Sequence, residues 1–234
     1  MLAGRFQSTN KTIEIRNSVH QLAFVANTSF PTRNLKVTIV LRRTSGSDHI
    51  VTRAIPLYEA ARLFSLGETH TAPISEDAVA LSFNISNGSF QLEAGEVLVV
   101  TLDGLSATDN IQLHTVEIPV YSRELFSIEE RVLDRDSIQQ TLNIEGYDAI
   151  SVGLGEVSLL RMDWLNGHST EYTQTEQQLI SQDAQAVVHY ANGDEGEACV
   201  PHNYSRNLVI PTIGVESITC SKDKLAVSIY LLMN

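Results

Sequence analysis

The sequence has few cysteines and no long apolar run. Its 234 residues include two cysteines, Cys199 and Cys220, which are too few for a disulfide framework, so we expect free thiols. With His189 and His202 they offer zinc ligands, but Cys-x-x-His with one distant cysteine is poor spacing for a zinc site. No stretch approaches the ~18 consecutive apolar residues of a membrane span, and the N-terminal residues lack the apolar core of a signal peptide. We therefore expect a globular chain.

Positive charge is also scarce. The chain has 16 lysines and arginines against 28 acidic residues, a formal net charge of −12. This balance argues against nucleic acid as the main partner, because phosphate binding depends on clustered lysine and arginine. Residues 1–120 hold 9 basic and 11 acidic side chains, whereas residues 121–234 hold 7 and 17. The second half is therefore the one better suited to bind cations or to face outward.

The usual catalytic motifs are missing. There is no Gly-x-Ser-x-Gly elbow, no phosphate-binding P-loop and no His-Glu-x-x-His zinc helix. A cupin-type metalloenzyme needs closely spaced histidines, but the seven histidines here are scattered singly. The single tryptophan, Trp164, argues against the exposed aromatic platforms of many sugar-binding modules. We expect no catalytic residues and no cofactor, although paired carboxylates for glycoside hydrolysis leave no sequence mark.

Two acidic loops are candidates for calcium. Asp194, Glu195 and Glu197 follow one another in a glycine-containing loop, and their carboxylates are the hard oxygen ligands that calcium prefers. Asp103 and Asp109 flank a second loop of this kind. The alternative in both cases is an acidic loop that simply faces water.

The clearest pattern lies between Leu35 and Leu66. Apolar residues alternate from Leu35 to Leu41, which predicts a strand with one buried face. Turn residues around Gly46 follow, and then a second short strand. Pro56 stands where the first position of a helix tolerates proline. Apolar residues then recur at helical spacing before Gly67, so the segment predicts a β-hairpin that leads into a short helix.

The same pattern returns about half a chain later. A strand from Val157 leads to Asn166-Gly167, the strongest short-range signal for a hairpin turn. After the return strand, Thr175 and Gln178 predict a capping box that opens a helix reaching Ala184. Two such units in register indicate two copies of one architecture.

The remaining segments predict an all-β chain of two tandem jelly-roll sandwiches, each with one short helix after a β-hairpin. We place the first jelly roll at residues 1–120, with residues 1–10 as a mobile arm, and the second at residues 138–234. Residues 121–137 are crowded with charge and have few apolar residues. We expect them to form the connection, with a helical turn.

The duplicated unit resembles a known family. Val37–Phe64, with Gly46 at its turn, and Val157–Ala184, with Gly167, resemble the double jelly-roll major capsid proteins of tailless, membrane-containing icosahedral bacterial viruses, in particular those of corticoviruses. The resemblance implies a homotrimer whose six jelly rolls form a pseudo-hexagonal block of an icosahedral shell over an internal membrane.

The resemblance also implies surroundings for this chain. The N-terminal segment and one end of the rolls would face the viral membrane, with Arg5 and Lys11 as the basic residues there. Divalent cations would bind at subunit contacts, a role for the acidic second half. The protein would lie in the virion capsid after assembly in the host cytoplasm.

We therefore predict a structural virion protein, the major capsid protein of a bacteriophage. One alternative is a vertex (penton) or spike protein of the same kind of virion. Another is a carbohydrate-binding or hydrolytic β-sandwich protein, for which the candidate sugar-binding residues are Tyr58, Tyr172, Tyr190 and Tyr204. Fold alone does not decide among these, because jelly rolls serve all of these functions.

Overall fold

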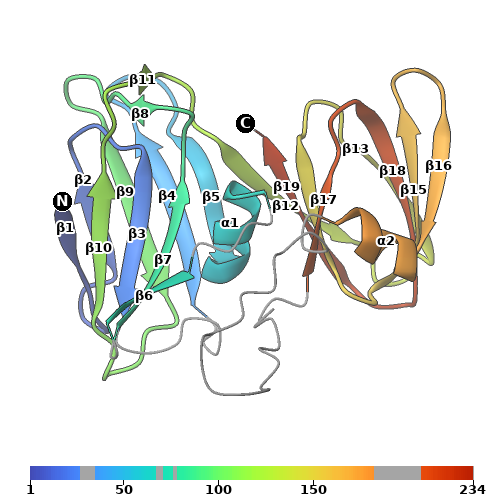
Figure 1. The fold of residues 1–234 in the computed structure, drawn as a ribbon, viewed down its shortest axis with the longest axis horizontal. Helices are drawn as coiled ribbons and strands as arrows, with labels where there is room; N and C mark the ends of the chain where they lie inside the picture. The colour runs from blue at the N-terminus through green and yellow to red at the C-terminus, as the bar shows by residue number, and fades with distance from the viewer. Residues whose placement is uncertain (27–34, 67–70, 76–77, 182–206, 234) are drawn as a thin grey trace, which may run out of the picture.

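The chain forms two β-sandwiches, one from each half of the sequence, which lie side by side (Figure 1). The structure, a computed structural model, describes residues 1–26, 35–66, 71–75, 78–181 and 207–233. In Figure 1 the strands of both sandwiches run roughly up and down the page. The N-terminus lies on the outer side of the first sandwich, and the last strand ends between the two.

The first sandwich, called the first roll below, consists of two antiparallel sheets. In spatial order, one sheet contains β1 (Leu2–Phe6), β10 (Ile111–Val116), β3 (Gln21–Ala26), β7 (Ala78–Asn84) and β6 (Thr71–Ser75). The other contains β2 (Thr12–Ile15), β9 (Val97–Asp103), β4 (Lys36–Arg42) and β5 (His49–Pro56). A short parallel pair at one end joins β8 (Ser89–Phe90) to β11 (Tyr121–Ser122).

The second sandwich, the second roll, also has two antiparallel sheets. The sheet nearer the first roll contains β12 (Ser127–Leu133), β19 (Val227–Met233), β14 (Ala149–Gly153) and β17 (Asn207–Pro211). We call it the junction sheet. The other contains β13 (Gln139–Asn143), β18 (Val215–Lys222), β15 (Val157–Trp164) and β16 (Ser169–Thr173).

The two rolls have the same connectivity. When the described strands of each roll are numbered in chain order, leaving out β6, β8 and β11, one sheet has the order 1-8-3-6 and the other 2-7-4-5. This is the strand order of a jelly roll. The prediction of an all-β chain with two tandem jelly rolls is therefore confirmed.

Both hairpins form where the sequence predicts them, and each is followed by a short helix. In β4 the side chains of Val37, Ile39 and Leu41 point into the core and are almost fully buried. The β4–β5 turn needs Gly46, whose φ of +86° favours glycine. Helix α1 (Leu57–Phe64) follows β5 without a gap.

The second helix, α2 (Gln174–Ile180), begins two residues earlier than predicted. Its capping box joins Thr173 and Glu176 rather than Thr175 and Gln178. The Thr173 side chain accepts a hydrogen bond from the Glu176 N–H, and the Thr173 N–H donates to Glu176 Oε2 at 2.8 Å. The prediction of the Thr175–Gln178 box was wrong. Both residue pairs have the three-residue spacing of a capping box, and the sequence alone did not show that β16 ends at Thr173, which makes Thr173 the N-cap.

A row of stacked phenylalanines forms the centre of the first roll. Phe6 stacks on Phe24, Phe24 on Phe83, and Phe83 on Phe64 of α1, with ring centroids 6.0, 5.8 and 5.1 Å apart. Phe6 is fully buried and belongs to β1, which pairs with β10. The prediction of a mobile arm at residues 1–10 was therefore wrong. One buried aromatic residue and backbone pairing are enough to fix this polar segment.

The charged interval at residues 121–137 contains strands instead of the expected helical turn. β12 pairs with β19 along all seven of its residues. Only Ile128 and Leu133 of β12 are buried, whereas the four residues between Ile128 and Leu133 are exposed. β12 is an edge strand, and charged residues on such an edge discourage pairing with other chains. Because four consecutive residues of β12 are exposed, its sequence lacks the alternation of apolar and polar residues that predicts a strand.

Candidate functional site at the junction between the rolls

Helix α1 lies between the two rolls and is buried along its whole length (Figure 1). Within its own roll it contacts β4, β5 and β7, and across the junction it contacts β14 and β17. An isolated surface helix would keep a polar face in water. The burial of all eight α1 residues shows that this helix joins the two rolls.

The junction sheet is covered on both faces. Successive side chains along its strands point to opposite faces of the sheet. Those on one face belong to the core of the second roll, and those on the other face belong to the cluster that is centred on the first roll. Ile150 and Leu231 point into the core of the second roll, whereas Ala149, Val209 and Leu232 pack with residues of the first roll. Burial of large apolar side chains stabilises by roughly 1.5–3 kcal/mol each, so this shared cluster holds the rolls together firmly.

Polar contacts at the centre of the junction connect α1 to the second roll. Arg62 is 1% exposed, and its Nη1 donates a hydrogen bond to the Asn207 carbonyl oxygen at 2.6 Å. The same nitrogen lies 3.7 Å from Glu59 Oε2, which accepts a hydrogen bond from Ser151 Oγ at 3.4 Å. Burial lowers the pKa of Arg62, and the charge of Glu59 opposes that shift.

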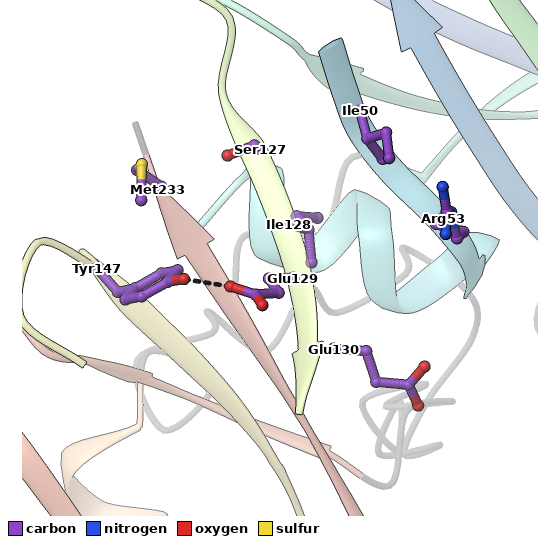
Figure 2. A pocket seen from close by; sticks show the side chains of 8 residues that line it. All are labelled: Ile50, Arg53, Ser127, Ile128, Glu129, Glu130, Tyr147 and Met233. Carbon is purple, nitrogen blue, oxygen red and sulfur yellow. Dashed lines mark hydrogen bonds between the residues drawn. The ribbon is translucent and has the colours of Figure 1, made fainter. Parts of the chain in front are cut away.

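A groove of about 480 Å³ lies where the edge strand β5 runs beside the edge strand β12. Figure 2 shows its lining side chains, which come from both rolls. They are Ile50, Arg53, Ser127, Ile128, Glu129, Glu130, Tyr147 and Met233. Next to Arg53, Ala54 has a φ of +51°, and its N–H donates to Thr38 Oγ1 at 2.9 Å. A bulge in β5 thus forms one wall of the groove.

A small polar network lies at one side of this groove. The Tyr147 hydroxyl donates a hydrogen bond to Glu129 Oε2, and Arg131 Nη2 lies 2.9 Å from Glu129 Oε1. Partial burial, and then the hydrogen bond to Glu129, raises the pKa of Tyr147 above its ordinary value. Tyr147 therefore stays a neutral hydrogen-bond donor at physiological pH.

The arrangement in the groove does not match the carboxylate pair of a glycosidase. Glu129 and Glu130 are neighbours on one strand, so their side chains point to opposite sides. Figure 2 shows Glu129 directed at Tyr147 and Glu130 directed away from it. Two carboxylates that flank a sugar bond would have to face each other, and this pair does not.

Most of the sequence-predicted metal ligands lie outside the described residues. These are the calcium candidates Asp194, Glu195 and Glu197 and the zinc candidates His189, Cys199 and His202. Calcium binding by the acidic loop stays a prediction. Of the second calcium candidate, Asp109 is buried and its Oδ2 accepts a hydrogen bond from the Ser106 N–H at 2.8 Å, an interaction within its own loop.

Two further findings concern metals and membranes. Within the part of the chain that the structure describes, no three His, Cys, Asp or Glu side chains gather as metal ligands would. In the same residues, neither helix is long and apolar enough to span a membrane. Cys220 is a buried free thiol, and burial raises its pKa to about 12.

Two of the four tyrosines predicted as sugar-binding candidates are described, and both pack inward. Tyr58 is 9% exposed in the junction helix. Tyr172 packs against the core of the second roll. Neither forms an exposed aromatic platform, so these two residues do not fit the sugar-binding alternative. Tyr190 and Tyr204 lie outside the described residues.

Sequence reasoning missed the residues at the centre of the junction. Glu59 and Arg62 are three positions apart on a helix, a spacing that is typical of ion pairs on solvated faces. The only sequence feature that pointed to burial of this pair was weak: α1 has apolar residues on several sides besides these two charged residues.

The fold defines the class of this protein: a double jelly roll, with two rolls of identical connectivity joined by a buried helix. Comparison with solved structures finds a similar one, the crystal structure of the major capsid protein P2 from bacteriophage PM2. The match has a TM-score of 0.52 and 9% sequence identity, and it covers 99% of this chain and 91% of that chain. It shows a shared fold. No protein family and no curated protein matches the sequence.

Proposed function

We propose that this protein is a structural virion protein, the major capsid protein of an icosahedral bacteriophage. The observation that carries the proposal is the extent of the structural likeness. The match to the PM2 capsid protein includes both rolls and nearly the whole of each chain. A likeness limited to one jelly roll would carry little weight, since that fold serves many functions.

The proposed assembly is a homotrimer. Two similar rolls held rigidly side by side make each chain a two-block unit, and three such units supply six blocks for a pseudo-hexagonal tile. A tile of this kind packs on a curved shell through short, repeated contacts between subunits. The burial of α1 and the shared apolar cluster support a rigid two-block unit.

Each jelly roll is proposed as a domain, with the boundary near residues 121–137. The protein would be located in the virion after assembly in the host cytoplasm, with its N-terminal end near an internal membrane. Arg5 is exposed in β1 and Lys11 is exposed just before β2. Both are thus accessible to anionic headgroups.

Electron microscopy of the purified protein tests this function. We expect class averages with a hexagonal outline, six lobes and three-fold symmetry. Particles with five-fold symmetry would indicate a vertex protein instead. Single two-lobed particles at every concentration would contradict a capsid role.

A further inference from the structure

The two helices are equivalent in position but differ in burial. α1 follows β5 and contacts β4, β5 and β7; α2 follows β16 and contacts β15, β16 and β17, the corresponding strands of its roll. Counted from the first helical residue, Ala60 and Leu63 of α1 correspond to Gln177 and Ile180 of α2. Ala60, Leu63 and Gln177 are buried, and Ile180 packs against the core of the second roll.

The faces directed away from each roll differ sharply. On α1 this face holds Glu59 and Arg62, which are 8% and 1% exposed because the second roll covers them. The corresponding residues of α2 are Glu176, which is exposed, and Leu179, which is 70% exposed. A single exposed leucine is ordinary. Leu179 is distinctive because it occupies the position through which α1 binds the next roll.

The surface that would receive α2 is also present. α1 packs on β14 and β17, and the corresponding strands of the first roll are β3 and β7. Their outward side chains include Ala23 and Val25, which pair in register with Ser82 and Ala80. These four residues are small, uncharged and half-buried. They form a smooth face on which a leucine can pack.

We propose that Leu179 of α2 packs on the outer face of β3 and β7 in a second copy of this chain, as α1 packs on β14 and β17 within the chain. The contact is head-to-tail, because it joins the second roll of one copy to the first roll of the next. Three such contacts, alternating with the three internal junctions, make a ring of six rolls. The inference rests on the proposed function and specifies its subunit contact.

The outer face of α2 and the outer face of β3 and β7 are suited to an apolar contact. At the internal junction, Glu59 receives a hydrogen bond from Ser151 on β14. In α2 the carboxylate of Glu176 is already engaged by Thr173 in the capping box. The β3 residue at the centre of the face is Ala23, which has no side-chain hydrogen bond to offer. An apolar contact through Leu179 is therefore the one that fits.

A substitution with a matched control tests this contact. We expect Leu179→Arg to lower the molar mass of the purified protein threefold, to that of one chain, because a guanidinium would be desolvated against an apolar face. The monomeric variant should still be folded, with the circular dichroism spectrum of the wild type, because Leu179 is 70% exposed within the chain. Ile213→Arg is the control: Ile213 is 72% exposed in the turn between β17 and β18, away from α2. It should leave the trimer intact.

The outcomes separate the two proposals. A wild-type monomer at all concentrations would overturn the capsid function and this contact together. A trimeric wild type with a trimeric Leu179→Arg variant would overturn the contact alone. If both arginine variants lost the trimer, cross-linking would show whether Leu179 lies next to the β3–β7 face of another copy. The double variant Ala23→Cys and Leu179→Cys, in a Cys199→Ser background, should yield dimers and trimers with a short bismaleimide, and their absence would overturn the contact.

Discussion

The junction between the rolls depends on single buried polar residues. Arg62 is the largest fully buried side chain among the described residues, and it reaches from α1 to the Asn207 carbonyl of the second roll. Glu59 lies beside it and binds Ser151. Apolar contacts are not directional, so on their own they would allow one roll to shift slightly relative to the other. These directional bonds favour one orientation.

The first prediction concerns this pair. We expect Arg62→Ala to lower the free energy of unfolding by about 3 kcal/mol, because it leaves the Glu59 carboxylate buried without its cation. Urea unfolding followed by circular dichroism measures the change. The matched control is the double variant Arg62→Met and Glu59→Gln, which removes both charges and should recover much of the loss. An Arg62→Ala variant as stable as the wild type would contradict the role of the pair.

The second prediction concerns Cys220. Its thiol is buried and its pKa is raised to about 12, so roughly one thiol in ten thousand is ionised at pH 8, and the thiolate is the reactive form. In a Cys199→Ser variant, we expect native protein to resist a disulfide reagent at pH 8 for hours. The same protein in denaturant should react completely within minutes. Fast reaction of the native protein would contradict the burial of this strand.

At the scale of elements, the capping box decides where α2 begins. The Glu176 carboxylate accepts hydrogen bonds from the Thr173 backbone N–H and hydroxyl, and these bonds lower its pKa. A carboxylate whose pKa is lowered on folding stabilises the protein above its unfolded pKa. That stability is lost as the pH falls through the folded pKa.

The third prediction follows from this sign. Glu176→Gln should be less stable than the wild type above the ordinary glutamate pKa of about 4.3, and the difference should shrink as the pH falls through the lowered pKa. Thr173→Ala should cost about 1 kcal/mol at neutral pH through loss of the N-cap. Thermal unfolding between pH 3 and pH 7 measures both. A Glu176→Gln difference that grows toward low pH would contradict the proposed capping box.

Elements with local signals were predictable from the sequence. The hairpins at Gly46 and Gly167 depend on turn chemistry that neighbouring residues supply, and both formed as predicted. β1 and β12 were missed because their strand character comes from partners far away in the chain. β1 is fixed by β10 and by the stacking of Phe6, and β12 is fixed by β19.

The site was less predictable than the fold. The residues of the junction come from α1, β5, β12, β14 and β17, which are far apart in the sequence. Apart from the apolar residues around it in α1, the local sequence does not distinguish a buried Glu59–Arg62 pair from a solvated one, because the second roll is what covers this pair. Duplication predicted two helices, but not that one of them would be buried at the junction.

At the scale of the whole molecule, the two rolls should behave as one unit. A single apolar cluster contains Phe64 and Phe83 of the first roll together with Val209 and Leu232 of the second. The fourth prediction is therefore one cooperative unfolding transition, in which fluorescence and circular dichroism report the same midpoint. Two separated transitions in the wild type would show that the rolls fold independently and that the junction is weak.

If this chain is the subunit of a trimeric capsid block, as we propose, its molar mass in solution should be that of a trimer. Size-exclusion chromatography with light scattering should give the mass of three 25.8 kDa chains, unchanged when the sample is diluted a hundredfold. A mass of one chain at every concentration, or of five chains, would contradict the proposed trimeric capsid subunit.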